Sequence, residues 1–164
     1  MANTRASGQI ARETFTNELF QILDETFEHV HGIYLDRDTS LFQTLETITA
    51  EEASIPVGGQ CATLAAQVAH VIFYLEVLEA YVMDKDFGKV DWGDIWRRVS
   101  TVSTEEWQAY KDQLVQTYRR IWTMLQNVQD WNEERPLGGA LAIVVHTAYH
   151  LGEIRQATCT LKQP

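Results

Sequence analysis

The sequence predicts an all-α protein that folds as a single four-helix bundle over residues 1–164. Apolar residues recur every three or four positions along four long stretches of the chain, as they do on the buried face of an amphipathic helix. No stretch sustains the alternation of apolar and polar residues that is typical of a strand. With 164 residues, 45% of them hydrophobic, the chain is long enough for one domain with its own core, and no linker divides it.

The first long helix is expected between Gln9 and Val30. Its apolar residues follow the helical period, whereas charged residues occupy mostly the other positions. Gly32 lies at or just beyond its end, where a residue that can adopt positive φ is favoured. The apolar positions are Phe15, Leu19, Ile22, Leu23, Phe27 and Val30.

A long crossover is expected between the first and second long helices, from Thr39 to Cys61. Two capping boxes, each a Ser or Thr followed three residues later by Gln or Glu, predict short helices over Leu41–Thr47 and Ala50–Ser54. A hairpin between neighbouring helices would need only a few residues, so this segment does not simply join two adjacent antiparallel helices. The capping pairs are Ser40 with Gln43 and Thr49 with Glu52.

Three further long helices complete the predicted bundle. The second, Thr63–Met83, is apolar over much of its circumference and is expected to pack centrally. After a loop and a short helical turn over Asp94–Val99, a capping box opens the third helix, Ser103–Gln129. The polar segment Asp130–Pro136 breaks the pattern, and the last helix is expected from Gly138 to Thr160.

Charge and cysteine content indicate which partners and which cellular compartment are expected. Thirteen Lys and Arg face 23 Asp and Glu, for a formal net charge of −10. Nucleic-acid and anionic-membrane binding depend on Lys and Arg, so we expect no nucleic-acid and no membrane partner. The five tryptophans also suit helix packing better than base stacking.

Cys61 and Cys159 are too few for a disulfide framework, and Met1–Ile10 lacks the apolar core of a signal peptide. The uncharged run Pro136–Gly152 is at the short limit for a membrane span and is expected to be a buried helix of a cytoplasmic protein.

Three of the five histidines lie in apolar helices and are candidates for a metal site. His146 and His150 are four residues apart, so their side chains project from one face of the last helix. His70 lies among apolar residues of the second long helix, and a buried imidazole needs a partner because an unpaired one costs free energy. Helices of a bundle commonly hold a metal ion between them in this way. The alternative is that these are core histidines that bond to hydroxyl, carbonyl or carboxylate groups.

The order of these residues resembles the DinB-like (damage-inducible, YfiT-type) superfamily of four-helix bundles. A lone histidine on the second long helix is followed by His-Thr-Ala-Tyr-His-Leu-Gly-Glu-Ile-Arg-Gln at 146–156, with Gly-Gly-Ala-Leu-Ala-Ile at 138–143 before it. The resemblance extends from the first helix to Gln156. It implies an up-down-down-up helix order, a homodimer, and a divalent metal ion, often nickel or zinc, with His70, His146 and His150 as ligands.

Two classes of function follow from this resemblance. Three neutral imidazoles leave a position open to water or a substrate atom, as in catalytic zinc sites. Some relatives use such a site to transfer low-molecular-weight thiols, so the first expectation is a metal-dependent thiol S-transferase or a hydrolase-like enzyme. The second is a non-enzymatic, stress-related protein in which a metal or small ligand only stabilises or signals. No Lys or Arg cluster is placed at the site by spacing, which weighs against a thiol cofactor that carries carboxylates.

Glu153 and Tyr74 are weaker candidates near the same site. Glu153 lies on or near the ligand face, where it could orient a histidine or act as a base. The alternative is a surface or ion-paired carboxylate. Tyr74 follows the lone histidine by one helical turn, and it either lines the same cavity or packs in the core.

His29, His31 and Cys61 are expected to lie outside the site. The two histidines are placed where the first helix ends, on different faces, and a solvent-side role is expected for them. Cys61 precedes a helix N-terminus, which stabilises a thiolate. It is nine residues from His70, about 13 Å along a helix, so we expect a small residue at the entry to the helix.

Overall fold

Helices make up the regular secondary structure of the part of the chain that the structure describes. This computed structural model describes residues 10–59 and 61–162, which contain seven α-helices, one short 3-10 turn and no strand. The all-α prediction is therefore confirmed. The elements are α1 (Arg12–Phe27), α2 (Leu41–Glu46), α3 (Ala50–Ala53), η1 (Val57–Gly59), α4 (Leu64–Val82), α5 (Asp94–Arg98), α6 (Thr104–Gln126) and α7 (Glu134–Leu161).

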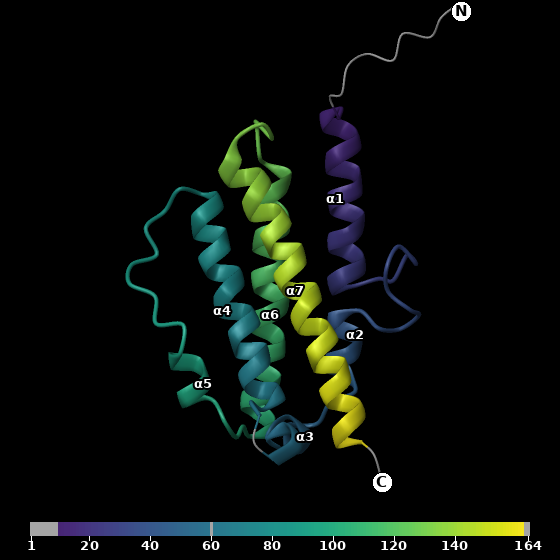
Figure 1. Cartoon of the computed structure of the whole chain (residues 1–164), viewed down its shortest axis with the longest axis vertical. Helices are drawn as coiled ribbons and strands as arrows, with labels where there is room; N and C mark the ends of the chain where they lie inside the picture. The colour runs from purple at the N-terminus through teal and green to yellow at the C-terminus, as the bar shows by residue number, and fades with distance from the viewer. Residues whose placement is uncertain (1–9, 60, 163–164) are drawn as a thin grey trace, which may run out of the picture.

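Four long helices lie side by side in Figure 1, where α1 and α7 run from top to bottom and α4 and α6 run from bottom to top. Helix α4 packs against both α6 and α7, and α7 also contacts α1. Phe20 of α1 and Trp122 of α6 bring their ring centroids within 4.8 Å, so α1 also meets α6. The short helix α5 lies in the connection from α4 to α6, on the outside of α4 (Figure 1).

The predicted capping boxes are present at the starts of α2, α3 and α6. At α6, the Ser103 hydroxyl accepts from the backbone N–H of Glu106 at 3.2 Å, and the Glu106 carboxylate accepts from the backbone N–H of Ser103 at 2.7 Å. Each box gives partners to N–H groups that have none within the helix. These local bonds explain why the sequence located the starts of these helices so closely.

Helix α7 begins at Glu134, earlier than the predicted opening at Gly138. Pro136, which was expected to precede the helix, occupies its third position instead. A proline is tolerated in the first turn because the N–H that it lacks would have no intrahelical acceptor there. Helix α6 correspondingly ends at Gln126 rather than Gln129.

Helix α1 ends at Phe27 rather than Val30, because the chain beyond it bonds to a buried carboxylate. The Glu25 side chain is fully buried, and its oxygens accept four backbone N–H bonds of 2.6 to 2.9 Å from the following loop. Burial alone would raise the pKa of Glu25, but the four donors outweigh it and lower the pKa to about 2. The donors are His31, Ile33, Tyr34 and Leu35.

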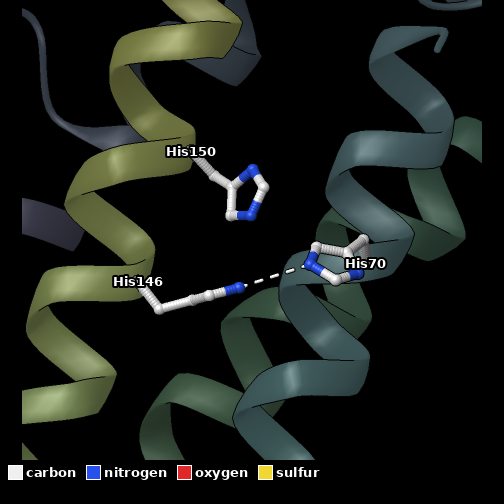
Figure 2. A group of neighbouring side chains, drawn as sticks. All are labelled: His70, His146 and His150. Atoms are coloured by element: carbon white, nitrogen blue, oxygen red, sulfur yellow. Dashed lines mark hydrogen bonds between the residues drawn. The ribbon is translucent and has the colours of Figure 1, made fainter. Parts of the chain in front are cut away.

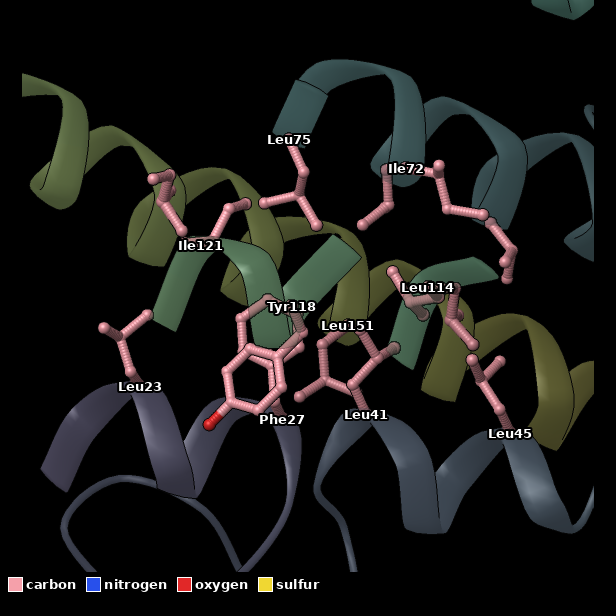
Figure 3. Close-up of a cluster of buried hydrophobic side chains, with 14 of the residues drawn as sticks. Leu23, Phe27, Leu41, Leu45, Ile72, Leu75, Leu114, Tyr118, Ile121 and Leu151 are labelled. Carbon is pink, nitrogen blue, oxygen red and sulfur yellow. The ribbon is translucent and has the colours of Figure 1, made fainter. Parts of the chain in front are cut away.

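Side chains from α1, α2, α4, α6 and α7 meet in one hydrophobic core (Figure 3). Phe27 stacks on Tyr118 with ring centroids 4.4 Å apart. The indole Nε1 of buried Trp107 donates to the Ile48 carbonyl at 2.8 Å, which attaches the crossover to α6. The crossover is therefore part of the core, and it covers one end of the long helices.

Helix α4 is long and apolar enough to span a membrane by length and composition, and among the described residues it alone meets this criterion. The core helix of a soluble protein meets it as well. Half of its most apolar window is buried inside the structure. The uncharged run Pro136–Gly152, expected to be a buried helix, lies within α7.

Candidate metal centre

Three histidines meet where α7 packs against α4. His70 comes from α4, His146 and His150 come from successive turns of α7, and Figure 2 shows their rings turned toward one another. Helix α7 approaches α4 closely at Gly139, where a Cβ atom would collide with the Val82 side chain. His70 is 9% exposed and His150 is 6% exposed. The packing of two helices thus places polar rings in a largely buried position.

The ring nitrogens have the spacing of metal ligands. Nε2 of His70 lies 3.3 Å from Nε2 of His146, and one ligand atom from each of the three histidines lies within 4.8 Å of the others. Two nitrogens that are each about 2.0–2.1 Å from a tetrahedral ion lie about 3.4 Å apart. The observed separation is therefore close to that expected for two ligands of one ion.

Burial keeps these imidazoles neutral. It is the main cause that lowers the pKa of each histidine, and the charge that His150 would carry lowers the pKa of His70 and His146 further. The pKa of His146 falls to about 3. The Nδ1 atoms of His70 and His146 are buried and have no hydrogen-bond partner among the described residues, whereas that of His150 contacts Glu153. Because a neutral imidazole with a free lone pair is the form that binds a metal, these residues fit a divalent ion.

Glu153 lies beside the three histidines. Its Oε2 atom lies within hydrogen-bonding distance of Nδ1 of His150, at 2.8 Å. The negative charge of the carboxylate opposes the lowering of the pKa of His150 and of His70. With its side chain 39% exposed, Glu153 contacts both the site and solvent.

Aromatic rings surround the histidines, and sequence reasoning found only one of them. Tyr74 stacks on His146, with ring centroids 3.5 Å apart and planes within 6°, so it lines the site. Trp96 of α5 lies 4.6 Å from His70, and Trp92 lies 5.4 Å from Tyr74. These two tryptophans were assigned to helix packing, but they are 39% and 48% exposed and belong to the cover of the site. Their position in a short, charged segment that cannot bury them by itself was the available signal.

The remaining candidates lie elsewhere. His29 and His31 follow the end of α1 rather than lying on two of its faces, and both contact Asp24, at 3.2 and 2.6 Å. Cys61 and Cys159 are exposed free thiols. Among the described residues, neither cysteine belongs to a group of side chains placed closely enough to share a metal ion.

The chain was compared with family models, with curated proteins and with solved structures, and none of the three comparisons found a match. The resemblance to the DinB-like superfamily therefore depends on the residues of the chain itself.

Proposed function

We propose that the chain is a DinB-like protein that binds a divalent metal ion, nickel or zinc, through His70, His146 and His150. The observation that carries this proposal is the convergence of three neutral imidazoles, two buried and one half-buried, from α4 and α7. The directions of the long helices and the long connection from α1 to α4 support the up-down-down-up order of a four-helix bundle (Figure 1). A cytoplasmic homodimer is part of the same proposal, and the net charge of −10 supports the expected absence of nucleic-acid and membrane partners.

Each residue of the site has a distinct task in this proposal. The histidines hold the ion, and Glu153 orients His150 through its Nδ1 atom. When bound, an ion with three imidazole ligands supplies a Lewis acid with a position open to water or to a thiol. Glu153 is also the carboxylate that would accept a proton in a metal-dependent hydrolase or thiol S-transferase. The rings of Tyr74 and Trp96 restrict the access of bulk water.

A non-enzymatic, stress-related metal- or small-ligand-binding protein is the second candidate, favoured by the charges at the site. The charged groups that act on the pKa values of the three histidines are the histidines themselves and Glu153. None of these would attract the carboxylates of an anionic thiol such as glutathione. A metal that only stabilises the native state needs no such recognition.

Metal analysis of the protein after dialysis tests the shared part of both candidates. The wild type is expected to retain zinc or nickel at the three histidines, and His146→Ala is expected to retain one ion per chain fewer. Val145→Ala is the matched control, because Val145 precedes the ligand but is 67% exposed. At a free metal concentration about 100 times Kd, the ion should add about 2.7 kcal/mol to the free energy of unfolding. A metal content that His146→Ala leaves unchanged, or a wild type that binds no metal, would contradict the proposal.

Activity separates the two candidates. The metal-loaded protein is assayed for conjugation of an electrophile with a panel of low-molecular-weight thiols, and for ester and amide hydrolysis. Turnover that disappears in His146→Ala but persists in Val145→Ala supports the enzyme. Metal-dependent thermal stability without turnover, and without a further shift on adding thiols, supports the binding protein.

A further inference from the structure

A second group of metal-ligating side chains lies at the C-terminal end of α1. One ligand atom from each of Asp24, Glu28 and His29 lies within 4.8 Å of the other two. Asp24 Oδ1 is 3.2 Å from His29 Nδ1, and Asp24 Oδ2 is 2.6 Å from His31 Nε2. The group shares no residue with the candidate metal centre between α4 and α7.

The surroundings of this group attract a cation. The last turn of α1 contains no basic residue, and the carbonyl end of a helix carries partial negative charge. The carboxylates of Asp24 and Glu28 add to this charge. The ion-pair contacts in this group are those of His29 and His31 with Asp24, and a histidine is charged only when it is protonated. The side chains of His29 and His31 are 73% and 42% exposed, so both rings are open to an ion from solvent.

A buried hydroxyl provides an independent observation. Tyr118 is 3% exposed, and its hydroxyl has no hydrogen-bond partner among the described residues. Figure 3 shows this hydroxyl directed toward α1. Burial raises the pKa of Tyr118, and the charges of Glu28 and Asp24 raise it further. A buried hydroxyl without a partner costs free energy, and a water molecule on an ion bound at the end of α1 would provide that partner.

We propose that Asp24, Glu28 and His29 form a second site for a divalent transition-metal ion such as Zn²⁺. Mixed carboxylate and imidazole donors are typical ligands of this ion. The 3.2 Å between the Asp24 oxygen and the His29 nitrogen is close to the separation of about 3.4 Å between two ligands of a tetrahedral ion. Because the loop that contains His29 and His31 also bonds to Glu25, the ion would fasten this loop to the end of α1.

Zinc titration tests the second site in the His146→Ala protein, in which the first site is impaired. The isotherm is expected to show one remaining Zn²⁺ per chain. Adding Asp24→Asn and His29→Gln should weaken the binding of that ion by at least about tenfold. Even the loss of a residue that only orients a metal ligand typically lowers metal affinity by that much. Glu18→Gln is the matched control, because it removes one exposed carboxylate from the same helix and should leave the affinity unchanged.

Two outcomes would overturn the second site. One is a His146→Ala protein that binds no Zn²⁺, and the other is an affinity that Asp24→Asn and His29→Gln leave unchanged. Because both substitutions are at partly or largely exposed side chains, far-UV circular dichroism is expected to show an unaltered fold. As a second readout, Co²⁺ added to the His146→Ala protein should shift the ring proton NMR signals of His29 and His31. A wild type that binds one ion at this end alone would support the second site and contradict the first.

Discussion

Two buried polar groups in this protein differ in how their hydrogen bonds are satisfied. The Glu25 carboxylate is fully buried and accepts four backbone N–H bonds. The rings of His70 and His146 lie in the packed interface of α4 and α7, but their Nδ1 atoms are buried and have no hydrogen-bond partner among the described residues. Glu25 therefore follows the rule that a buried polar group is hydrogen-bonded, whereas these two histidines depart from it.

This difference separates a structural polar group from one that is prepared for a ligand. Glu25 has its partners inside the chain, so its charge is stabilised and its role is to hold the loop after α1. The Nδ1 atoms of His70 and His146 find no such partner among the described residues, their Nε2 atoms meet at 3.3 Å, and burial keeps the rings neutral, which is the state that accepts a metal ion. Substitutions should therefore affect stability at the first group and metal binding at the second.

Removal of the Glu25 carboxylate should have the largest effect on stability. Glu25→Ala leaves four N–H donors without their acceptor, and a buried donor without a partner costs about 1–3 kcal/mol. With water replacing some of these bonds, we expect a loss of about 3 kcal/mol in the free energy of unfolding, measured by urea denaturation. Glu18→Ala, an exposed substitution on the same helix, should stay within about 0.5 kcal/mol of the wild type. Equal losses of stability in Glu25→Ala and Glu18→Ala would show that the buried carboxylate stabilises the fold no more than an exposed one does.

The contact that brings the histidine-bearing helices together gives the next largest effect. Gly139→Ala places a methyl group against the Val82 side chain, and overpacking of this kind costs about 1–3 kcal/mol. Because α7 must shift relative to α4, metal affinity should fall together with stability. Gly152→Ala is the control: nothing lies within 4 Å of its new methyl group, and in a helix alanine is favoured over glycine by about 1 kcal/mol. A Gly139→Ala protein with unchanged thermal midpoint and zinc affinity would show that this approach does not position the site.

Glu153→Gln should have a smaller effect, confined to the metal. If Glu153 orients His150, the substitution should weaken metal binding by about tenfold with little change in the stability of the metal-free protein. Loss of its negative charge should also lower the pKa of His150 further, which NMR titration of the ring measures. Glu134→Gln, at the other end of α7, is the control for the change in net charge. An unchanged metal affinity would show that Glu153 is a surface carboxylate without a role in metal binding.

A last effect is expected on the pH dependence of stability. His146 has an ordinary pKa of 6.5 that folding lowers to about 3, so in metal-free protein the unfolded state binds the extra proton and stability declines as the pH falls below 6.5. For Glu25, folding lowers the pKa from 4.5 to about 2, so its contribution is complete above pH 4.5 and is lost as the pH falls toward 2. Urea midpoints between pH 8 and pH 2 should separate these windows. His146→Ala should reduce only the first decline and Glu25→Gln only the second.

The sequence predicted the helices well because their signals are local. The capping boxes at Ser40, Thr49 and Ser103 were all confirmed. The boundaries that were wrong depend on information outside the local pattern. Helix α1 ends early because Glu25 bonds to the loop, and α7 starts early because Pro136 is accepted in a first turn. The homodimer, the compartment and the absence of nucleic-acid or membrane partners stay predictions.

The candidate site was predicted in part. The apolar surroundings of His70 and the spacing of His146 and His150 marked the three residues, whereas Trp92 and Trp96 were missed because their neighbours in sequence say nothing about α4. Asp24 was missed as the common partner of His29 and His31, because the helix was expected to continue to Val30 with the two histidines on different faces.

By itself, the sequence determined that this protein is helical, that it is acidic, and which histidines share a helix face. These properties depend on residues within one or two helical turns and on composition, so they need no knowledge of the fold. Only the tertiary structure decided that His70 meets His146, which is 76 residues away in the chain. The packing of α7 on α4 brings the two rings together. The same packing shields them from water, which disfavours the protonated form and lowers the pKa of His146.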